Sequence, residues 1–356
     1  MERIDEAHRP VSLWCAAHRV RRYPPVASAV PDHMSAFTRL LRPALLSAAA
    51  SPRVERTVTN MRATRSMVDR FVAGTTEADA LTAVTALLDS GRWVTVDYLG
   101  EYTTDPAQAR DTVERYQRLV AALAELPAAW LPGNVRPVEV SMKLSALGQS
   151  LPADGHRIAL DHAREICATA TDAGIAVTVD AEDHTTTDST LAIVRELRAE
   201  FPSVGTVLQA YLRRTENDCR EFAGPGSRIR LCKGAYREPA AVAFQRSSEV
   251  DDSYRRCLRV LMSGSGYPMV ATHDPAMIAA AATYADECQR GPGDFEFQML
   301  YGIREAEQAR LVAAGHRMRV YLPYGERWYG YFMRRLAERP ANLAFFLRAL
   351  TSRERV

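Results

Sequence analysis

The chain has 356 residues, of which 47% are hydrophobic and 25% are charged, proportions that are typical of a folded globular protein and exclude a disordered or collagen-like chain. Its formal net charge is only +2, so we expect no nucleic-acid partner. No apolar run reaches the roughly 20 residues that span a bilayer. The richest run, residues 40–50, contains Arg42 and Pro43.

The six cysteines are scattered, without a CxxC pair or the spacing of metal ligands. This pattern predicts reduced thiols, a cytoplasmic protein and no metal site. Of the 45 basic residues, only Lys143 and Lys233 are lysines. In so arginine-rich a chain, the two lysines are candidates for work that a guanidinium cannot do.

The chain begins with a segment, residues 1–33, that is rich in Arg, His and Pro and lacks helical or strand periodicity. We expect a flexible N-terminal extension there. Helical spacing of apolar residues then predicts an N-terminal helical arm over 34–92. Beyond it, short apolar or β-branched runs predict strands at 93–99, 138–144, 175–180, 204–212, 229–232, 268–272, 295–300 and 318–322. Amphipathic segments predict helices that include 106–126, 156–173, 189–199, 249–262, 275–288, 305–313 and 328–338.

Eight strand candidates separated by helical segments match the size and rhythm of a (β/α)8 barrel, which we predict over 93–356. A doubly wound open sheet is the alternative. It has less support because no GxGxxG motif follows the first strand. The predicted fold class is therefore α/β, a TIM-like barrel preceded by N-terminal helices.

Polar residues gather where the predicted strands end, which is where such barrels carry their active sites. Taken singly, each would be interpreted as a hydrogen-bonded cap of a strand end. Together they predict one rim that binds a polar or anionic ligand. These residues are Lys143, Asp180, Gln209, Arg230, Lys233, Thr272, His273, Asp274, Gln298 and Tyr321.

The spacing alone leaves two chemistries open. A barrel lysine, Lys143 or Lys233, suits a Schiff-base aldolase. Lys233 is followed by glycine and alanine, which lets backbone amides approach phosphate or a ring edge and suits a flavin or phosphate site. Metal-dependent hydrolysis has little support, because only His273 and Asp180 lie where ligands are needed.

A C-terminal segment adds cations to this rim. Four aromatic residues lie just before Arg334 and Arg335, and they argue against a purely solvated basic helix. Adjacent helical arginines point about 100° apart, so both reach one carboxylate only if the end of the helix faces it. Glu338 is close enough in sequence to orient one of them.

Several long motifs occur together in one order. RLCKGAYRE at 230–238 is preceded by QAYL at 209–212 and followed by ATHD at 271–274, EFQMLYG at 296–302 and YFMRRLAERPAN at 331–342. In this order they resemble the motifs of the proline dehydrogenase family. The resemblance extends from about residue 35 to the C terminus and matches the length of the stand-alone bacterial members.

The resemblance implies a distorted (β/α)8 barrel that binds FAD non-covalently. It implies oxidation of L-proline to 1-pyrroline-5-carboxylate, with electrons passed to a quinone, as the first step of proline degradation to glutamate. We expect 1-pyrroline-5-carboxylate dehydrogenase to be a separate protein, and thus a candidate partner. A quinone acceptor implies at most peripheral contact of this cytoplasmic protein with the inner face of the membrane. Residues 40–50 are a weak candidate for that contact.

The resemblance also assigns roles to residues. Flavin binding is implied for Ala181, Gln209, Arg230, Lys233, Gly234, Ala235, Thr272 and His273. Binding of the substrate carboxylate is implied for Lys143, Arg334 and Arg335, with Tyr321 beside the proline ring. The two catalytic candidates are Arg230, whose charge would stabilise an anionic reduced flavin, and Asp180, which would form an ion pair with Lys143 and position it.

Two other interpretations stay open. A biosynthetic homologue that oxidises a proline-like cyclic amino acid would keep the flavin residues and could keep the arginine pair. A regulatory barrel without turnover has less support, because the motif set is complete and the net charge is nearly neutral.

Overall fold

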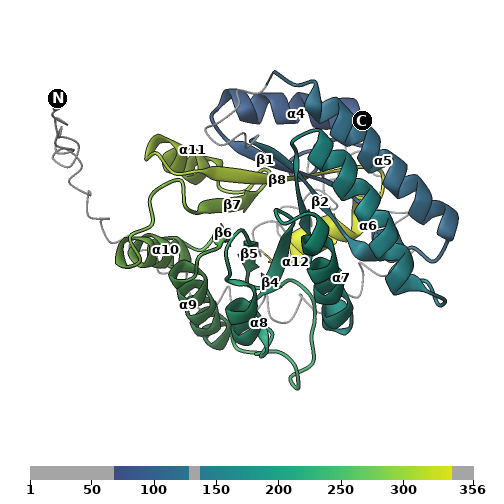
Figure 1. Ribbon diagram of the computed structural model, residues 1–356. Coiled ribbons are helices and arrows are strands. Elements are labelled where there is room, and N and C mark those ends of the chain that lie inside the picture. The colour runs from purple at the N-terminus through teal and green to yellow at the C-terminus, as the bar shows by residue number, and fades with distance from the viewer. Residues whose placement is uncertain (1–67, 128–136, 339–356) are drawn as a thin grey trace, which may run out of the picture. The chain divides into compact units, whose positions relative to one another are not determined.

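The computed structural model describes residues 68–127 and 137–338. Eight parallel strands pair in chain order, and the last pairs with the first to close a barrel (Figure 1). The predicted (β/α)8 fold is confirmed. The strands are β1 (Trp93–Tyr98), β2 (Val138–Met142), β3 (Ala176–Val179), β4 (Gly205–Gln209), β5 (Arg228–Cys232), β6 (Tyr267–Ala271), β7 (Glu296–Leu300) and β8 (Met318–Tyr324).

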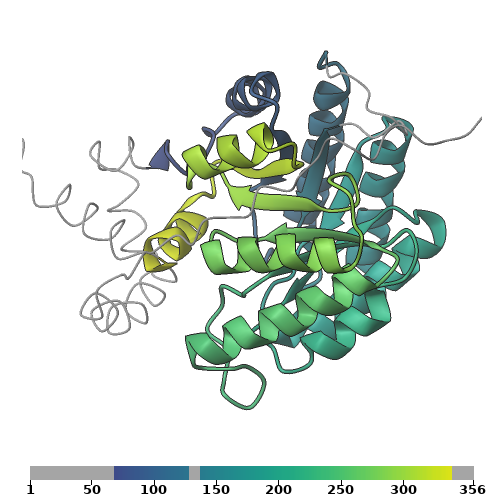
Figure 2. The ribbon, with the colours of Figure 1, turned by 90° about the vertical axis from the view of Figure 1, so that its left-hand side faces the viewer.

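Helices lie outside the strands, and the predicted ones begin and end close to the predicted residues (Figure 2). They are α5 (Pro106–Ala124), α6 (Gly155–Asp172), α7 (Thr187–Glu200), α9 (Ser247–Ser263), α10 (Pro275–Glu287), α11 (Glu305–Ala313) and α12 (Tyr329–Glu338). A further helix, α8 (Thr215–Phe222), was not predicted. It has eight residues, and only Cys219 and Phe222 give it a buried apolar face, too few to form a repeat. Short 3-10 turns, η1 (Leu144–Leu147) and η2 (His184–Thr186), follow β2 and β3.

The predicted N-terminal parts are described only in their last portion. The extension at 1–33, the arm up to residue 67 and the apolar run at 40–50 lie outside the described residues. Helix α4 (Glu77–Asp89) begins at Thr76, whose side chain and that of Asp79 form a capping box. Its buried residues belong to the same apolar cluster as the barrel. The domain boundary at residue 92 stays a prediction.

Two helices of the ring start at an aspartate followed by proline, Asp105 before α5 and Asp274 before α10. Each aspartate accepts a hydrogen bond of 2.9 Å from the backbone N–H two residues later, and proline suits the first helical turn. Asp274 thus ends the β6 loop three residues after the strand, and this fixes Thr272 and His273 at the rim of the barrel.

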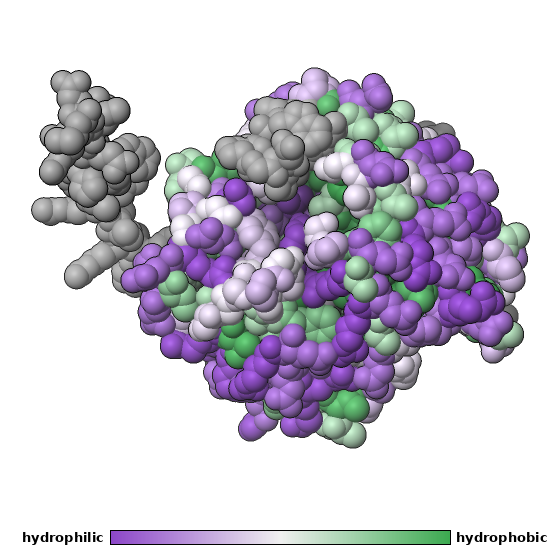
Figure 3. All heavy atoms as spheres, in the orientation of Figure 1, coloured by the Kyte–Doolittle hydropathy of each residue, from purple (hydrophilic) through white to green (hydrophobic). Residues whose placement is uncertain are grey.

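Apolar side chains fill the layer between the strands and the helices, and most of the face shown in Figure 3 is hydrophilic with apolar residues in small groups. The barrel interior is different from the branched apolar layers usual in this fold. Five buried charged side chains lie on the strands themselves: Asp97, Glu139, Arg230, Glu296 and Arg319. Within the described residues, no helix is long and apolar enough to cross a bilayer.

Candidate active site

A cavity of about 480 Å³ lies at the carboxyl ends of the strands, the end across which α12 runs in Figure 2. Every residue assigned to the site from the sequence lines this cavity. They are Lys143, Asp180, Ala181, Gln209, Arg230, Lys233, Gly234, Ala235, Thr272, His273, Tyr321, Arg334 and Arg335. The structure thus brings them to one place, and their individual roles stay predictions.

Lys143 lies at the floor of the cavity, directly after β2. Its Nζ is 2.7 Å from Oδ2 of Asp97, 3.3 Å from Oδ2 of Asp180 and 3.2 Å from the Tyr321 hydroxyl. An ammonium has three N–H donors, so these contacts use all of them. Burial alone would lower the pKa of Lys143, but the two carboxylates outweigh it and raise the pKa. Lys143 is therefore a fixed positive charge.

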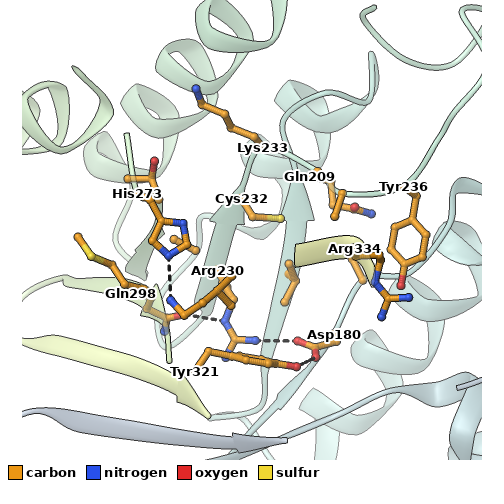
Figure 4. Close-up of a pocket in the computed structure, with 18 of the residues that line it drawn as sticks. Asp180, Gln209, Arg230, Cys232, Lys233, Tyr236, His273, Gln298, Tyr321 and Arg334 are labelled. Atoms are coloured by element: carbon orange, nitrogen blue, oxygen red, sulfur yellow. Dashed lines mark hydrogen bonds and ion pairs between the residues drawn. The ribbon is translucent and has the colours of Figure 1, made fainter. Parts of the chain in front are cut away.

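Asp180 follows β3 and accepts hydrogen bonds on both oxygens (Figure 4). Oδ1 accepts from Arg230 at 2.7 Å and from the Ser141 hydroxyl at 2.8 Å, and Oδ2 accepts from the Tyr321 hydroxyl at 2.6 Å. Burial would raise the pKa of Asp180, but Lys143 and Arg230 hold it below its usual value. Asp180 is therefore ionised, and its expected contact with Lys143 is present.

Arg230 extends from the middle of β5 into the barrel and is held from three sides. Its Nε donates to Gln298 at 2.6 Å and its Nη2 to Glu139 at 2.9 Å, in addition to the bond with Asp180. The guanidinium also lies 5.3 Å from the centre of the Tyr321 ring. Its positive charge is thus placed at the cavity before any ligand arrives, as electrostatic catalysis requires.

The arginine pair of α12 also lines the cavity. Arg334 forms a two-pronged ion pair with Glu101, in the loop after β1, and its guanidinium lies 5.6 Å from the Tyr236 ring centre. Arg335 stacks near Tyr331, with 5.0 Å between the guanidinium and the ring centre. The side chain of Glu338, predicted to orient one arginine, lies outside the described part of the chain.

Lys233 points away from the Arg230 cluster (Figure 4) and contacts Asp251 and Asp274, the latter at 2.7 Å. With Gly234 and Tyr236 it also lines a second cavity of about 300 Å³. The backbone at Gly234 has φ +112°, and a Cβ there would collide with the ring of Tyr211, so only glycine fits. The two cavities share these residues and together form one elongated site.

The rim is further ordered by hydrogen bonds to the backbone. His273 Nε2 accepts from the N–H of Leu300 at 2.9 Å, which connects the β6 loop to β7. The Gln209 amide donates to the carbonyl of Glu182 at 2.8 Å, which connects β4 to the β3 loop. Both side chains therefore have fixed orientations.

Five acidic residues that contact the site or line its second cavity were not found from the sequence: Asp97, Glu101, Glu139, Glu182 and Asp251. Asp97 and Glu139 lie inside strands that are buried on both faces, and a charged residue in such a run was the available signal. Glu101 and Glu182 lie in loops and gave no pattern. Glu182 accepts from the N–H and hydroxyl of Ser145, and burial raises its pKa to about 7.

Eight parallel strands with a charged, elongated cavity at their carboxyl ends define an enzyme of the (β/α)8-barrel class. The sequence model of the proline dehydrogenase family matches residues 80–348. The chain belongs to the proline dehydrogenase family, and it is an oxidoreductase.

Curated relatives support this assignment. Proline dehydrogenase 1 of Bacillus subtilis (strain 168) is 41% identical over 81% of this chain and 91% of its own length. Proline dehydrogenase of Deinococcus radiodurans is 39% identical over 88% of this chain and 98% of its own length. A crystal structure of proline utilization A (PutA) from Bdellovibrio bacteriovorus, inactivated by N-propargylglycine, has a TM-score of 0.72 and 27% identity over 90% of this chain. The match spans 38% of that longer chain.

Proposed function

We propose that this chain oxidises L-proline to 1-pyrroline-5-carboxylate, with FAD as cofactor and a quinone as electron acceptor, as the first step of proline degradation. Family membership supports the reaction. The observation that carries the proposal is that Lys143, Arg334 and Arg335 line one cavity with Arg230 and Tyr321. Three cations around one cavity suit a small carboxylate.

The residues present fit FAD. The two cavities share Lys233 and Gly234 in their linings, so a flavin in the larger cavity would have the smaller one beside it for its nucleotide part. Gly234 lines both cavities at this junction, and Lys233 provides a partly exposed cation there for the anionic part. The residues that would hold FAD are Ala181, Gln209, Arg230, Lys233, Gly234, Ala235, Thr272 and His273. When bound, FAD accepts the hydride equivalent from the substrate.

The protein side chains would orient the substrate and balance charge. Lys143, Arg334 and Arg335 would bind the carboxylate, and Tyr321 would lie beside the ring. Together these contacts would hold the ring carbon next to nitrogen in one position relative to the cofactor. An oriented substrate needs little further help from the protein. The amine must be unprotonated so that its lone pair can assist hydride loss. Arg230, fixed by Asp180, Glu139 and Gln298, would stabilise the negative charge that develops.

An absorbance spectrum of the purified protein tests this proposal. Flavin bands that bleach on anaerobic addition of L-proline would support it. Bands that persist with proline but bleach with another cyclic amino acid would replace it with a biosynthetic oxidation. A protein that binds no flavin after incubation with FAD would contradict it.

The same proposal includes three further points. The electron acceptor is a quinone, the protein is cytoplasmic with at most peripheral membrane contact, and a separate 1-pyrroline-5-carboxylate dehydrogenase is its partner. The Escherichia coli (strain K12) Bifunctional protein PutA is 28% identical over 80% of this chain, which corresponds to 24% of that protein. Proline-dependent reduction of a water-soluble quinone, compared with reduction of oxygen, tests the acceptor. Oxygen reduction at an equal rate would contradict it.

A further inference from the structure

Asp97, on β1, is the acidic residue that the proposed function leaves without a role. Its side chain is fully buried behind Lys143, and Oδ2 lies 2.7 Å from Lys143 Nζ. Among the residues that the structure describes, Oδ1 has no hydrogen-bond partner. A buried carboxylate oxygen without a partner is costly, so this arrangement calls for an explanation.

The groups that face Asp97 provide little positive charge. Lys143, after β2, is the cation in contact with it, and Asp180, after β3, adds a second negative charge. Tyr321 and Tyr324 on β8 and Tyr116 on α5 also face it, and burial raises the pKa of each phenol, so all three are neutral. Asp97 therefore depends on one shared ammonium for positive charge, with the Tyr321 hydroxyl as a weaker second contact.

The pKa directions of the two carboxylates agree with this geometry. Burial raises the pKa of Asp97, and Asp180 adds to the effect while Lys143 and the Tyr321 hydroxyl oppose it. The pKa of Asp180 is instead lowered, because burial is outweighed by Lys143 and Arg230. Two acids on one ammonium thus have opposite tendencies to bind a proton, a recurrent feature of sites that handle protons.

An arriving ligand carboxylate makes this difference larger. The three donors of Lys143 are already in use, so the ligand must share or displace one of its acceptors. Asp180 keeps its bonds to Arg230, Ser141 and Tyr321. Besides Lys143, Asp97 has only the Tyr321 hydroxyl, whose proton is already donated to Asp180, and a third negative charge at the same ammonium favours the neutral form of Asp97.

We propose that Asp97 takes up one proton, on Oδ1, when a carboxylate ligand binds at Lys143. One O–H bond forms at Asp97 as the bond between that proton and its donor breaks, and no group is oxidised or reduced. With an amine-free ligand the proton comes from solvent. With L-proline, the ammonium that must lose its proton before hydride transfer can supply it. The inference rests on the proposed function in placing the substrate carboxylate at Lys143, and Asp97 acts through Lys143 as a positioning residue.

The proton can be counted with cyclopentanecarboxylate, a five-membered ring carboxylate without nitrogen. We would titrate it into the flavin-loaded protein by calorimetry at pH 7, in phosphate and in Tris, whose ionisation heats differ. The difference in heat should correspond to uptake approaching one proton per ligand. The Kd should weaken by up to tenfold per pH unit between pH 6 and 8. No proton uptake and a flat Kd would overturn the proposal.

Two variants assign the proton to a residue. Asp97→Asn should abolish the uptake and bind cyclopentanecarboxylate at least as tightly as the wild type at pH 8. The matched control is Glu182→Gln, which removes a second buried acid near the cavity with a raised pKa, and it should keep the uptake. If Asp97 only supports Lys143 structurally, Asp97→Asn weakens binding and leaves the uptake unchanged. Loss of uptake in Glu182→Gln alone would also overturn the proposal.

An infrared difference spectrum provides a second readout that needs no variant of Asp97. Ligand binding to the wild type should produce the carbonyl band of a protonated carboxyl group, and its absence would contradict the inference. The proposed function is tested separately, by the bleaching of flavin with L-proline. Bleaching without proton uptake therefore rejects only the inference, and a flavin that no substrate bleaches rejects the proposed function.

Discussion

The two ends of the barrel interior hold similar charged residues, but their carboxylates differ in how they are paired. We define the lower cluster, toward the amino ends of the strands, as Glu139, Glu296, Arg228 and Arg319. Both oxygens of each glutamate accept hydrogen bonds: Glu139 from Arg228, Arg230 and Thr95, and Glu296 from Arg319, Gln298 and Tyr267. Burial would raise the pKa of Glu139, but Arg319, Arg228 and Arg230 hold it well below its usual range.

The upper cluster, at the carboxyl ends, consists of Asp97, Lys143, Asp180 and Tyr321. Here two carboxylates share one ammonium, and an oxygen of Asp97 has no partner among the described residues. Nearby, burial raises the pKa of Glu182. The carboxylate oxygens of the lower cluster are thus all paired with cations or other donors, although Nη1 of Arg228 has no partner among the described residues, whereas the upper cluster leaves carboxylate charge unbalanced where a ligand is expected. Local cost at a binding site, compensated elsewhere, is the usual compromise.

Breaking the lower cluster should have the largest effect, on stability. Glu139→Ala leaves Arg228, Arg230 and Arg319 around an empty position, and removing one partner of a buried ion pair costs about 3–5 kcal/mol. Urea unfolding of the flavin-free protein measures this loss of unfolding free energy. The matched control is Glu165→Ala, because Glu165 also pairs with an arginine, Arg110, but at an exposed site, where the loss should stay below about 1 kcal/mol. Equal losses of stability in the two variants would mean that burial does not make the ion pairs of the lower cluster more important than an exposed pair.

Glu182→Gln tests the unbalanced charge of the upper end through pH. The folded-state pKa of Glu182 is about 7, above its ordinary value of 4.5, so the folded state binds the proton more tightly than the unfolded state. Wild-type stability therefore falls as pH rises from about 4.5 to about 7 and stays lower above that range. At about 1.4 kcal/mol per pKa unit, the loss is on the order of 3 kcal/mol.

The glutamine variant does not titrate and should lack this loss. The amide still bonds to Ser145, so the fold should be kept. Relative to the wild type, the variant should therefore be more stable at pH 8 than it is at pH 5. Denaturant unfolding at the two pH values measures the difference. Parallel pH profiles for the two proteins would show that Glu182 titrates normally.

The sequence predicted the upper end of the barrel better than the lower end, for a physical reason. Strands buried on both faces appear as continuous apolar runs, so the polar residue that ends each run, such as Lys143 or Asp180, is visible. The motif resemblance then placed the remaining cavity residues. The partners of these residues depend on register: Arg230 and Glu139 are 91 positions apart, and no local pattern reports that they meet across the barrel. Helix α8 was missed because its two buried apolar residues form no repeat.

Arg334→Ala should lower kcat/KM for proline by about 30-fold, because a charge-assisted hydrogen bond to a carboxylate is worth about 2 kcal/mol. Most of the kinetic effect should be in KM. Tm should also fall, because the two side chains of the ion pair with Glu101 are only 15% and 17% exposed and Glu101 loses its partner. Arg327→Ala is the control: Arg327 is exposed and bonds to Gln108, away from the cavity, and should leave kcat/KM unchanged. A drop in Tm with normal kinetics would instead give Arg334 a structural role only.

The smallest expected effect concerns Lys233. Its charge is balanced by Asp251 and Asp274, as in the lower cluster, but its side chain is 33% exposed and lines the cavity. Solvent weakens such a pair, so replacing the cation should cost about 1 kcal/mol in ligand binding. Lys233→Met should therefore raise the Kd for FAD about fivefold. The cap of α10 should survive, because Asp274 accepts from Ala276 through its other oxygen. The rise in flavin fluorescence on dilution measures the release of FAD. The control is Arg256→Met, which removes an exposed partner of Glu216 on the outer helices. An unchanged Kd with a lowered Tm would place Lys233 with the lower cluster, as a support of the barrel and not of the cofactor.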